Sequence, residues 1–117
     1  MVRQARGEGR ATVIRGEIWL AALDPTIGSE IQKTRRCVIL SPAEMNEQLR
    51  TVMVAPMTTG SRPAPSRIPV LFQRRAGFIL LEQIRTLDKS RLMRRLGAVS
   101  AATLASTLAT LREIFAE

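Results

Sequence analysis

Short apolar segments recur along this chain of 117 residues, and each is closed by residues that break regular structure. Segments of four to eight residues with such boundaries are typical of β-strands rather than of helices. The predicted strands cover residues 17–23, 37–40, 51–58, 68–72 and 78–84. Because the strands follow one another in series and a helical pattern closes the chain, the sequence predicts an antiparallel α+β fold, compatible with a small and partly open β-barrel.

Residues that interrupt regular structure also predict what connects the first three strands. An Asp-Pro pair ends the first strand, so residues 24–32 are expected to form a loop. The motif S-P-A-E, which starts at Ser41, matches a capping box with proline at the first helical position and predicts a short helix to about Leu49. Pro56 lies near the end of the third strand and predicts an edge strand or a bulge, because proline donates no backbone hydrogen bond.

The second half of the chain holds further turns. Residues 59–67 contain one glycine and two prolines, which predicts a mobile loop. The basic segment 73–77 separates two apolar runs and predicts the turn of a hairpin. Residues 85–88 lead into a basic stretch, 89–95, with a sixth strand or a short helix near it.

The last segment has the pattern of an amphipathic helix capped by Ser100. The apolar residues that follow helical spacing are Leu104, Leu108, Leu111 and Phe115, and Ile114 widens their stripe. We expect this stripe to serve core or dimer packing and not to bind a ligand.

The charge of the chain is strongly positive. Eighteen basic residues face 10 acidic ones, for a formal net charge of +8. Lys33 and Lys89 are the only lysines, so arginine supplies the rest. Since the arginine fork matches phosphate geometry, a partner that carries many phosphates is the natural interpretation, although net charge alone also fits a merely soluble basic surface.

Composition excludes several kinds of chemistry. The chain has no histidine, which rules out histidine acid–base catalysis, Ser-His or Cys-His nucleophiles and mixed Cys/His zinc sites. Neither a phosphate-binding P-loop nor a dinucleotide-binding glycine motif is present. The carboxylates are scattered along the sequence, so we expect no metal site and no cofactor.

Composition also predicts organisation and location. Residues 1–13 are basic and lack periodicity, so we interpret them as a flexible arm that precedes one domain, 14–117. No apolar run is long enough to span a membrane, and the N-terminus has no secretory signal pattern. Cys37, the single cysteine, has no partner for an internal disulfide, which fits the reducing cytoplasm.

Five sequence blocks occur in the order and spacing of one protein family. The blocks are R-G-E-I-W from Arg15, L-D-P-T-I-G-S-E from Leu23, T-R at Thr34 before the strand V-I-L, V-A-P-M-T-T from Val54 and I-L-L-E-Q-I-R-T-L-D from Ile79. Together they resemble the MazF/PemK toxins, the ribonuclease halves of bacterial toxin–antitoxin pairs. The resemblance spans residues 14 to about 115.

This resemblance implies an SH3-like barrel with a C-terminal helix that works as a homodimer. It implies sequence-specific cleavage of single-stranded RNA, mostly messenger RNA, to 2′,3′-cyclic phosphate and 5′-hydroxyl ends. It also implies an inhibitor encoded beside the toxin. We expect this antitoxin to be an acidic segment that folds across the dimer and covers Arg35.

Arg35 and Thr58 are the leading candidates for the catalytic site. Attack by the 2′-hydroxyl of RNA needs removal of a proton, stabilisation of charge on the phosphorane and a proton for the leaving oxygen. A guanidinium can hold two phosphate oxygens and stabilise developing charge, and the hydroxyl of a threonine at a strand end can donate to a phosphate oxygen. The matching arginine and threonine of the family are catalytic partners.

Glu30 and Glu82 are the candidate general bases. Glu30 belongs to the predicted loop 24–32, and Glu82 to a predicted strand that is otherwise apolar, where a carboxylate needs a reason. The alternatives are a solvated loop charge for Glu30 and an ion pair with Arg85 for Glu82. We further expect RNA contacts from Arg15, Glu17, Ser29, Gln32, Lys33, Arg36, Thr59 and Arg85, with the loops 24–32 and 59–67 bordering the RNA groove.

Two departures from the family pattern bear on mechanism. Arg36 stands where the family usually has proline after the catalytic arginine, so the aim of Arg35 is loosened or Arg36 adds a phosphate contact. Leu80 stands where PemK-type members have an arginine, so a mechanism with that arginine as the acid does not transfer. Two other functions remain open: a toxin of the same fold that binds DNA gyrase without catalysis, and a basic RNA-binding module that has lost activity.

Overall fold

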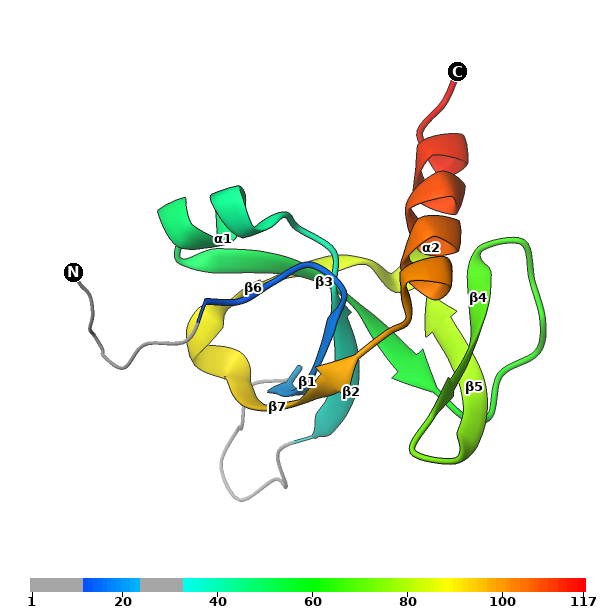
Figure 1. Cartoon of the computed structure of the whole chain (residues 1–117), viewed down its shortest axis with the longest axis horizontal. Coiled ribbons are helices and arrows are strands. Elements are labelled where there is room, and N and C mark those ends of the chain that lie inside the picture. Colours follow the sequence, from blue (N-terminus) through cyan, green and yellow to red (C-terminus); the bar gives the residue numbers. More distant parts are fainter. Residues whose placement is uncertain (1–11, 24–32) are drawn as a thin grey trace.

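A curled antiparallel sheet forms the body of the molecule (Figure 1). The computed structural model describes residues 12–23 and 33–117, and this part contains seven strands. The strands are β1 (Glu17–Ala22), β2 (Thr34–Ile39), β3 (Thr51–Thr58), β4 (Arg67–Phe72), β5 (Arg75–Leu80), β6 (Arg85–Asp88) and β7 (Leu92–Ala98). Two α-helices, α1 (Ala43–Gln48) and α2 (Ala101–Ile114), and two 3₁₀ turns, η1 (Leu81–Gln83) and η2 (Lys89–Arg91), complete the described elements.

Strand β3 has different partners along its two edges. The sheet order is β4-β5-β3-β2-β1-β7, and β6 pairs with β3 outside this path. Along one edge β3 pairs with β6 up to Val54 and with β5 from Met57, while β2 occupies the other edge. Pro56 therefore lies in the gap between two partners, where a missing N–H does least harm. The prediction of an edge or a bulge is wrong, because β3 is a central strand and its pairing with β2 is regular.

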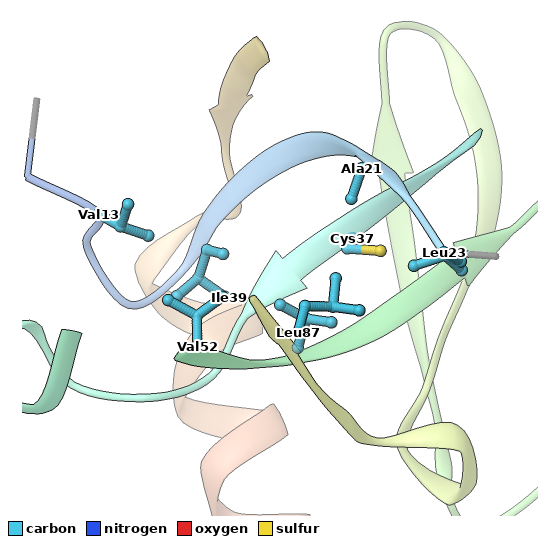
Figure 2. Close-up of a cluster of buried hydrophobic side chains, with 8 residues drawn as sticks. Val13, Ala21, Leu23, Cys37, Ile39, Val52 and Leu87 are labelled. Carbon is cyan, nitrogen blue, oxygen red and sulfur yellow. The ribbon is translucent and has the colours of Figure 1, made fainter. Parts of the chain in front are cut away.

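Both faces of the central strands are buried. One core cluster contains Cys37 and Ile39 of β2, and the other contains Val38 and Leu40, in the alternation expected of a strand. Figure 2 shows the first cluster, to which β1, β2, β3 and β6 all contribute. Burial on two faces explains why residues 37–40, the second half of β2 and the residue after it, are a continuous apolar run without polar alternation.

Helix α2 covers the second cluster beside β4 (Figure 1). The side chain of Ser100 accepts a hydrogen bond from the backbone N–H of Thr103, so the predicted cap is confirmed. The predicted apolar stripe is only partly buried in the described chain. Leu111 packs on the core, whereas Phe115 is 73% exposed, and the fully buried residue of the helix is Thr107, whose hydroxyl donates to the carbonyl of Thr103.

Helix α1 begins without the predicted capping box. The hydroxyl of Ser41 donates instead to Oδ1 of Asn46 and accepts from the backbone N–H of Met53, so it is not available to the first turn. The amide of Asn46 in turn donates to the carbonyl of Val13. Val13 is buried in the first cluster (Figure 2), which corrects its assignment to the N-terminal arm; residues 1–11 of that arm lie outside the described residues.

Three strand boundaries, the start of β2 and both ends of β5, differ by three residues or more from those predicted. Strand β2 begins at Thr34, three residues earlier than expected, because its polar start still pairs with β1. The hairpin turn is the pair Gln73 and Arg74, both with positive φ (52° and 65°), and not a segment of five residues. Two consecutive positive φ values fit the right-handed twist of a hairpin. After Leu80 the chain turns into η1, so the predicted strand 78–84 ends early.

No helix in the described segments is both long and apolar enough to cross a membrane.

Replacement of Leu81 by alanine should destabilise the protein by about 2–5 kcal/mol, because it removes a side chain that is only 2% exposed and leaves a cavity. The matched control is Leu71→Ala on β4, where the leucine is 74% exposed and the loss should be below about 0.5 kcal/mol. Denaturant unfolding followed by the fluorescence of Trp19 gives both values. Equal losses in the two variants would contradict this arrangement of the core.

Alkaline pH should destabilise the protein through Cys37. Burial raises the pKa of this thiol to about 11, against ~8.5 in an unfolded chain. Between these values the unfolded chain releases the proton and the folded one keeps it, so the free energy of unfolding falls as pH rises. The slope from this group approaches about 1.4 kcal/mol per pH unit. Unfolding of the wild type and Cys37→Ala from pH 8 to 11 tests this, and parallel pH profiles would refute it.

Candidate functional site

A cleft of about 470 Å³ opens where β2 begins and β3 ends. Strands β1, β2, β3 and β7 form one wall, and the β4–β5 hairpin forms the other. The apolar residues that line the cleft are Leu20, Met57, Val70, Phe72 and Leu96; the polar and charged ones are Thr34, Arg35, Arg36, Thr58, Thr59, Gln73, Arg75 and Arg94, with Gly77 between them. Four of these apolar residues are partly buried and also pack against the second core cluster: Met57, Val70, Phe72 and Leu96. The cleft is thus the open end of that cluster.

The charge of the cleft is one-sided. Arg35, Arg36, Arg75 and Arg94 line it, and none of its lining residues is a carboxylate. Positive charges gathered around one cleft repel one another unless an anion lies between them. This arrangement fits a phosphate-bearing ligand.

Arg35 and Thr58 lie near the strand ends that meet at this end of the sheet. Cys37 and Pro56 are the last pair of the β2–β3 ladder at this end, and the same register extended by two residues leads to Arg35 on β2 and Thr58 on β3. Both residues line the cleft. The structure therefore brings together the two residues that the sequence selected from separate blocks.

The backbone around Thr58 is tightly constrained. Oγ1 of Thr58 accepts a hydrogen bond from the backbone N–H of Gly60 at 3.3 Å, which leaves the hydroxyl proton free to be donated. On the other side, Gly77 approaches so closely that a Cβ atom there would overlap the carbonyl oxygen of Thr58. A glycine at position 77 is therefore what allows β5 to hold Thr58 at the rim of the cleft.

Arg36 crosses the cleft to the hairpin. Its Nη2 donates to Oε1 of Gln73 at 3.2 Å. Its Nε is buried and finds no acceptor among the described residues. Consecutive residues of a strand point to opposite faces, so the side chains of Arg35 and Arg36 leave β2 on opposite faces of the sheet.

Glu82, the second candidate base, lies outside the cleft, in η1, and forms an ion pair at 2.9 Å with Arg67 and not with Arg85, the alternative considered above. The hydroxyl of Ser66 also donates to it at 2.8 Å. Desolvation is the largest single influence on its pKa and acts to raise it. The hydrogen bonds from Ser66 and Arg67, with the charge of Arg67, outweigh desolvation and lower this pKa below its ordinary value. Glu82 was expected in an apolar strand, but it is an exposed and anchored carboxylate.

Three further candidates are engaged in the fold away from the cleft. Arg15 donates to the carbonyl of Leu40, and Arg85 donates to the carbonyl of Leu23. Glu17 is 7% exposed, accepts from the indole of Trp19 and forms an ion pair with Arg95 at 2.8 Å. None of the three lines the cleft.

The remaining candidates divide between the cleft rim and the undescribed loop. Thr59 lines the cleft, and Lys33 is exposed immediately before β2. Ser29, Glu30 and Gln32 lie outside the described residues.

The sequence analysis named four of the residues that line the cleft and missed the others, among them Phe72, Gln73, Arg75 and Arg94. The signals were present in the basic turn 73–77 and the basic stretch 89–95. Recognition of β7 as a strand would have separated Arg94, which faces the cleft, from Arg95, which pairs with Glu17 on the other face.

Within the described segments, no group of three or more histidine, cysteine or acidic residues is arranged to hold a metal ion. Cys37 is completely buried and its raised pKa keeps the thiol protonated, so it is neither a nucleophile nor a ligand.

Sequence comparisons identify close relatives. The sequence model of the family described as PemK-like, MazF-like toxin of type II toxin–antitoxin systems matches residues 14–115. The endoribonuclease PemK of Escherichia coli is 38% identical over 106 residues, which cover 86% of this chain and 80% of that protein. The endoribonuclease MazF of Staphylococcus epidermidis is 39% identical over 92 residues, covering 74% and 77%.

Solved structures agree on the fold. A MazE–MazF crystal structure from Deinococcus radiodurans superposes with a TM-score of 0.77 at 24% identity, covering 90% of this chain and 96% of that one. A mycobacterial endoribonuclease in complex with its cognate antitoxin gives a TM-score of 0.71 at 22% identity, covering 86% and 92%. The expected small barrel with a C-terminal helix is confirmed.

The match over residues 14–115, together with relatives at 38% and 39% identity, places the chain in the PemK-like, MazF-like family of type II toxin–antitoxin toxins.

Proposed function

We propose that this toxin is a metal-independent endoribonuclease that cuts single-stranded messenger RNA at specific sequences in the arginine-lined cleft, with the 2′-hydroxyl as nucleophile. The observation that carries the proposal is that Arg35 and Thr58 line one cleft, whose lining includes four arginines and no carboxylate. The relatives named endoribonucleases support the activity.

Arg35 and Thr58 act on the scissile phosphate. The guanidinium of Arg35 binds two non-bridging oxygens and stabilises the charge that develops on the phosphorane. The hydroxyl of Thr58, whose oxygen already accepts from Gly60, donates a hydrogen bond to one of these two oxygens. Both groups are supplied by strand ends, which limits their motion as charge builds up.

The general base is assigned to Glu30. Of the two candidate carboxylates, Glu82 is anchored by Arg67 and Ser66 away from the cleft and has a lowered pKa, which makes it a weak base. Glu30 belongs to the connection between β1 and β2, which returns to the sheet directly before Arg35. The leaving 5′-oxygen takes its proton from water or from Arg35, and arginine is a poor acid because its pKa exceeds about 12. Slow turnover follows.

The same surface accounts for the partners. A net charge of +8 attracts any polyanion, so an acidic antitoxin segment competes with RNA for the cleft. The structures that are similar in fold include an endoribonuclease with its cognate antitoxin and a MazE–MazF complex, which supports this role. The active form is a homodimer in the cytoplasm, where RNA is available and a single free cysteine is stable.

A single 2′-deoxy substitution on the 5′ side of the scissile phosphate should abolish cutting at that bond and leave cutting at other sites unchanged. The nucleophile is then absent while every phosphate contact remains. Gel analysis of a long RNA with one modified site measures this, and excess EDTA should change neither result. Persistent cleavage at the modified bond would indicate a water or side-chain nucleophile, and loss of activity in EDTA that one metal restores would refute metal independence.

Replacement of Arg35 by alanine should reduce the rate of cleavage about 10²–10³-fold, because the main charge stabiliser is lost. The side chain is exposed, so the unfolding transition should change little. Arg50→Ala is the matched control: Arg50 is also exposed but precedes β3, at the opposite end of the strand from Thr58. Cleavage by Arg35→Ala at the rate of the control would refute the assignment of the site.

A further inference from the structure

Arg36 and Arg94 lie in one row across three adjacent strands. Leu20 of β1 pairs with Arg36 of β2 on one side and with Arg94 of β7 on the other. Residues paired in this way point to the same face of a sheet, here the face that lines the cleft. Since neighbouring strands are about 4.8 Å apart, the two Cα atoms are separated by roughly 10 Å, and two long guanidinium side chains can converge above Leu20.

Arg36 carries a buried donor without an acceptor. Its Nη2 is bonded to Gln73, while Nε finds no acceptor in the described part of the chain although it is inaccessible to solvent. Nε and Nη2 form the edge of the guanidinium that usually binds two oxygens of one anion. Leaving such a charged donor unpaired is costly, and a turn of the side chain that brings Nε to a ligand oxygen relieves this cost.

The opposite wall closes the space without adding negative charge. Phe72 at the tip of the hairpin packs so closely on β7 that a Cβ on Gly97 would be 3.0 Å from its ring. Arg75, paired with Phe72 across the hairpin, adds a third cation. Among the described residues, Arg67 and Arg95 form ion pairs with carboxylates, and neither of them lines this cleft.

We propose that Arg36 and Arg94 form a second phosphate clamp, which holds the RNA phosphate next to the one that is cut. This inference rests on the proposed RNA substrate. Arg35 and Arg36 are consecutive on β2 and leave it on opposite faces, so they engage two successive phosphates instead of competing for one. The residue that departs from the family's proline thereby gains a role in positioning the substrate, and Gln73 fixes the orientation of its guanidinium.

The test uses an uncleavable oligonucleotide, with 2′-deoxyribose at the scissile position, and replaces one phosphate at a time by an uncharged methylphosphonate. For wild-type protein, neutralising the phosphate beside the scissile one should weaken binding about tenfold to hundredfold, as expected for loss of a charged hydrogen-bonded contact. The same replacement should have no further effect in Arg36→Gln or Arg94→Gln, because the clamp is already broken.

Two other variants separate charge from folding. Gln73→Glu keeps the length of the side chain but gives Arg36 an internal carboxylate, so it should weaken binding as Arg36→Gln does while the melting temperature stays close to that of the wild type. Arg50→Gln, at the far end of β3, should retain the full methylphosphonate effect. The slope of log Kd against log salt concentration should fall by about 0.7 in Arg36→Gln, as expected for one phosphate of a single strand.

Each outcome decides one point. If every methylphosphonate weakens the binding of Arg36→Gln and Arg94→Gln as much as it weakens that of the wild type, the clamp does not exist, even though the wild type binds RNA. If these variants change the base preference at one position while every methylphosphonate effect persists, the arginines contact a base, and the proposal is wrong. Failure of the wild-type protein to bind the oligonucleotide at all would instead refute the proposed function.

Discussion

Strand β3 is the element on which the rest of the structure depends, because one of its edges is shared by two partners. It pairs with β6 over its first half and with β5 over its last residues, and Pro56 lies between the two sets. A strand that changes partners in this way lets the sheet curl, since β5 and β6 leave in different directions (Figure 1). The curl produces two cores and leaves one of them open at the end where Thr58 lies.

The open end places charge beside apolar surface, and strand alternation decides which charges are used. Arg94 and Arg95 are neighbours, yet Arg95 neutralises the buried Glu17 while Arg94 faces the cleft. Some arginines, such as Arg95, thus stabilise the fold through ion pairs, whereas those that line the cleft, such as Arg94, repel one another. Like charges in one cleft lower stability, and a bound polyanion relieves this cost. Stability and ligand binding are therefore coupled through the same guanidinium groups.

Local chemistry explains how much could be predicted from the sequence. The second half of β2 is buried on both faces and leaves a continuous apolar run, and Ser100 is a strong cap, so the existence of the strand and the start of the helix were predicted correctly. The hairpin was placed too wide because Gln73 and Arg74 adopt positive φ without the glycine or asparagine that usually indicates such a turn. The missing capping box has a tertiary cause: Ser41 is bonded to Asn46 and Met53, and the latter contact joins residues 12 positions apart.

The candidate site shows the same division. Arg35 and Thr58 were identified through motifs, but their proximity follows from the register of β2 on β3, which no local pattern contains. Arg94 and Arg75 reach the cleft only through the pairing of β7 with β1 and through the curl of the hairpin, both long-range events. Gly77 has no recognisable motif at all, yet its missing side chain lets β5 press against Thr58. The geometry of the site is thus set by backbone contacts, and the arginines supply charge to a position that the backbone has already defined.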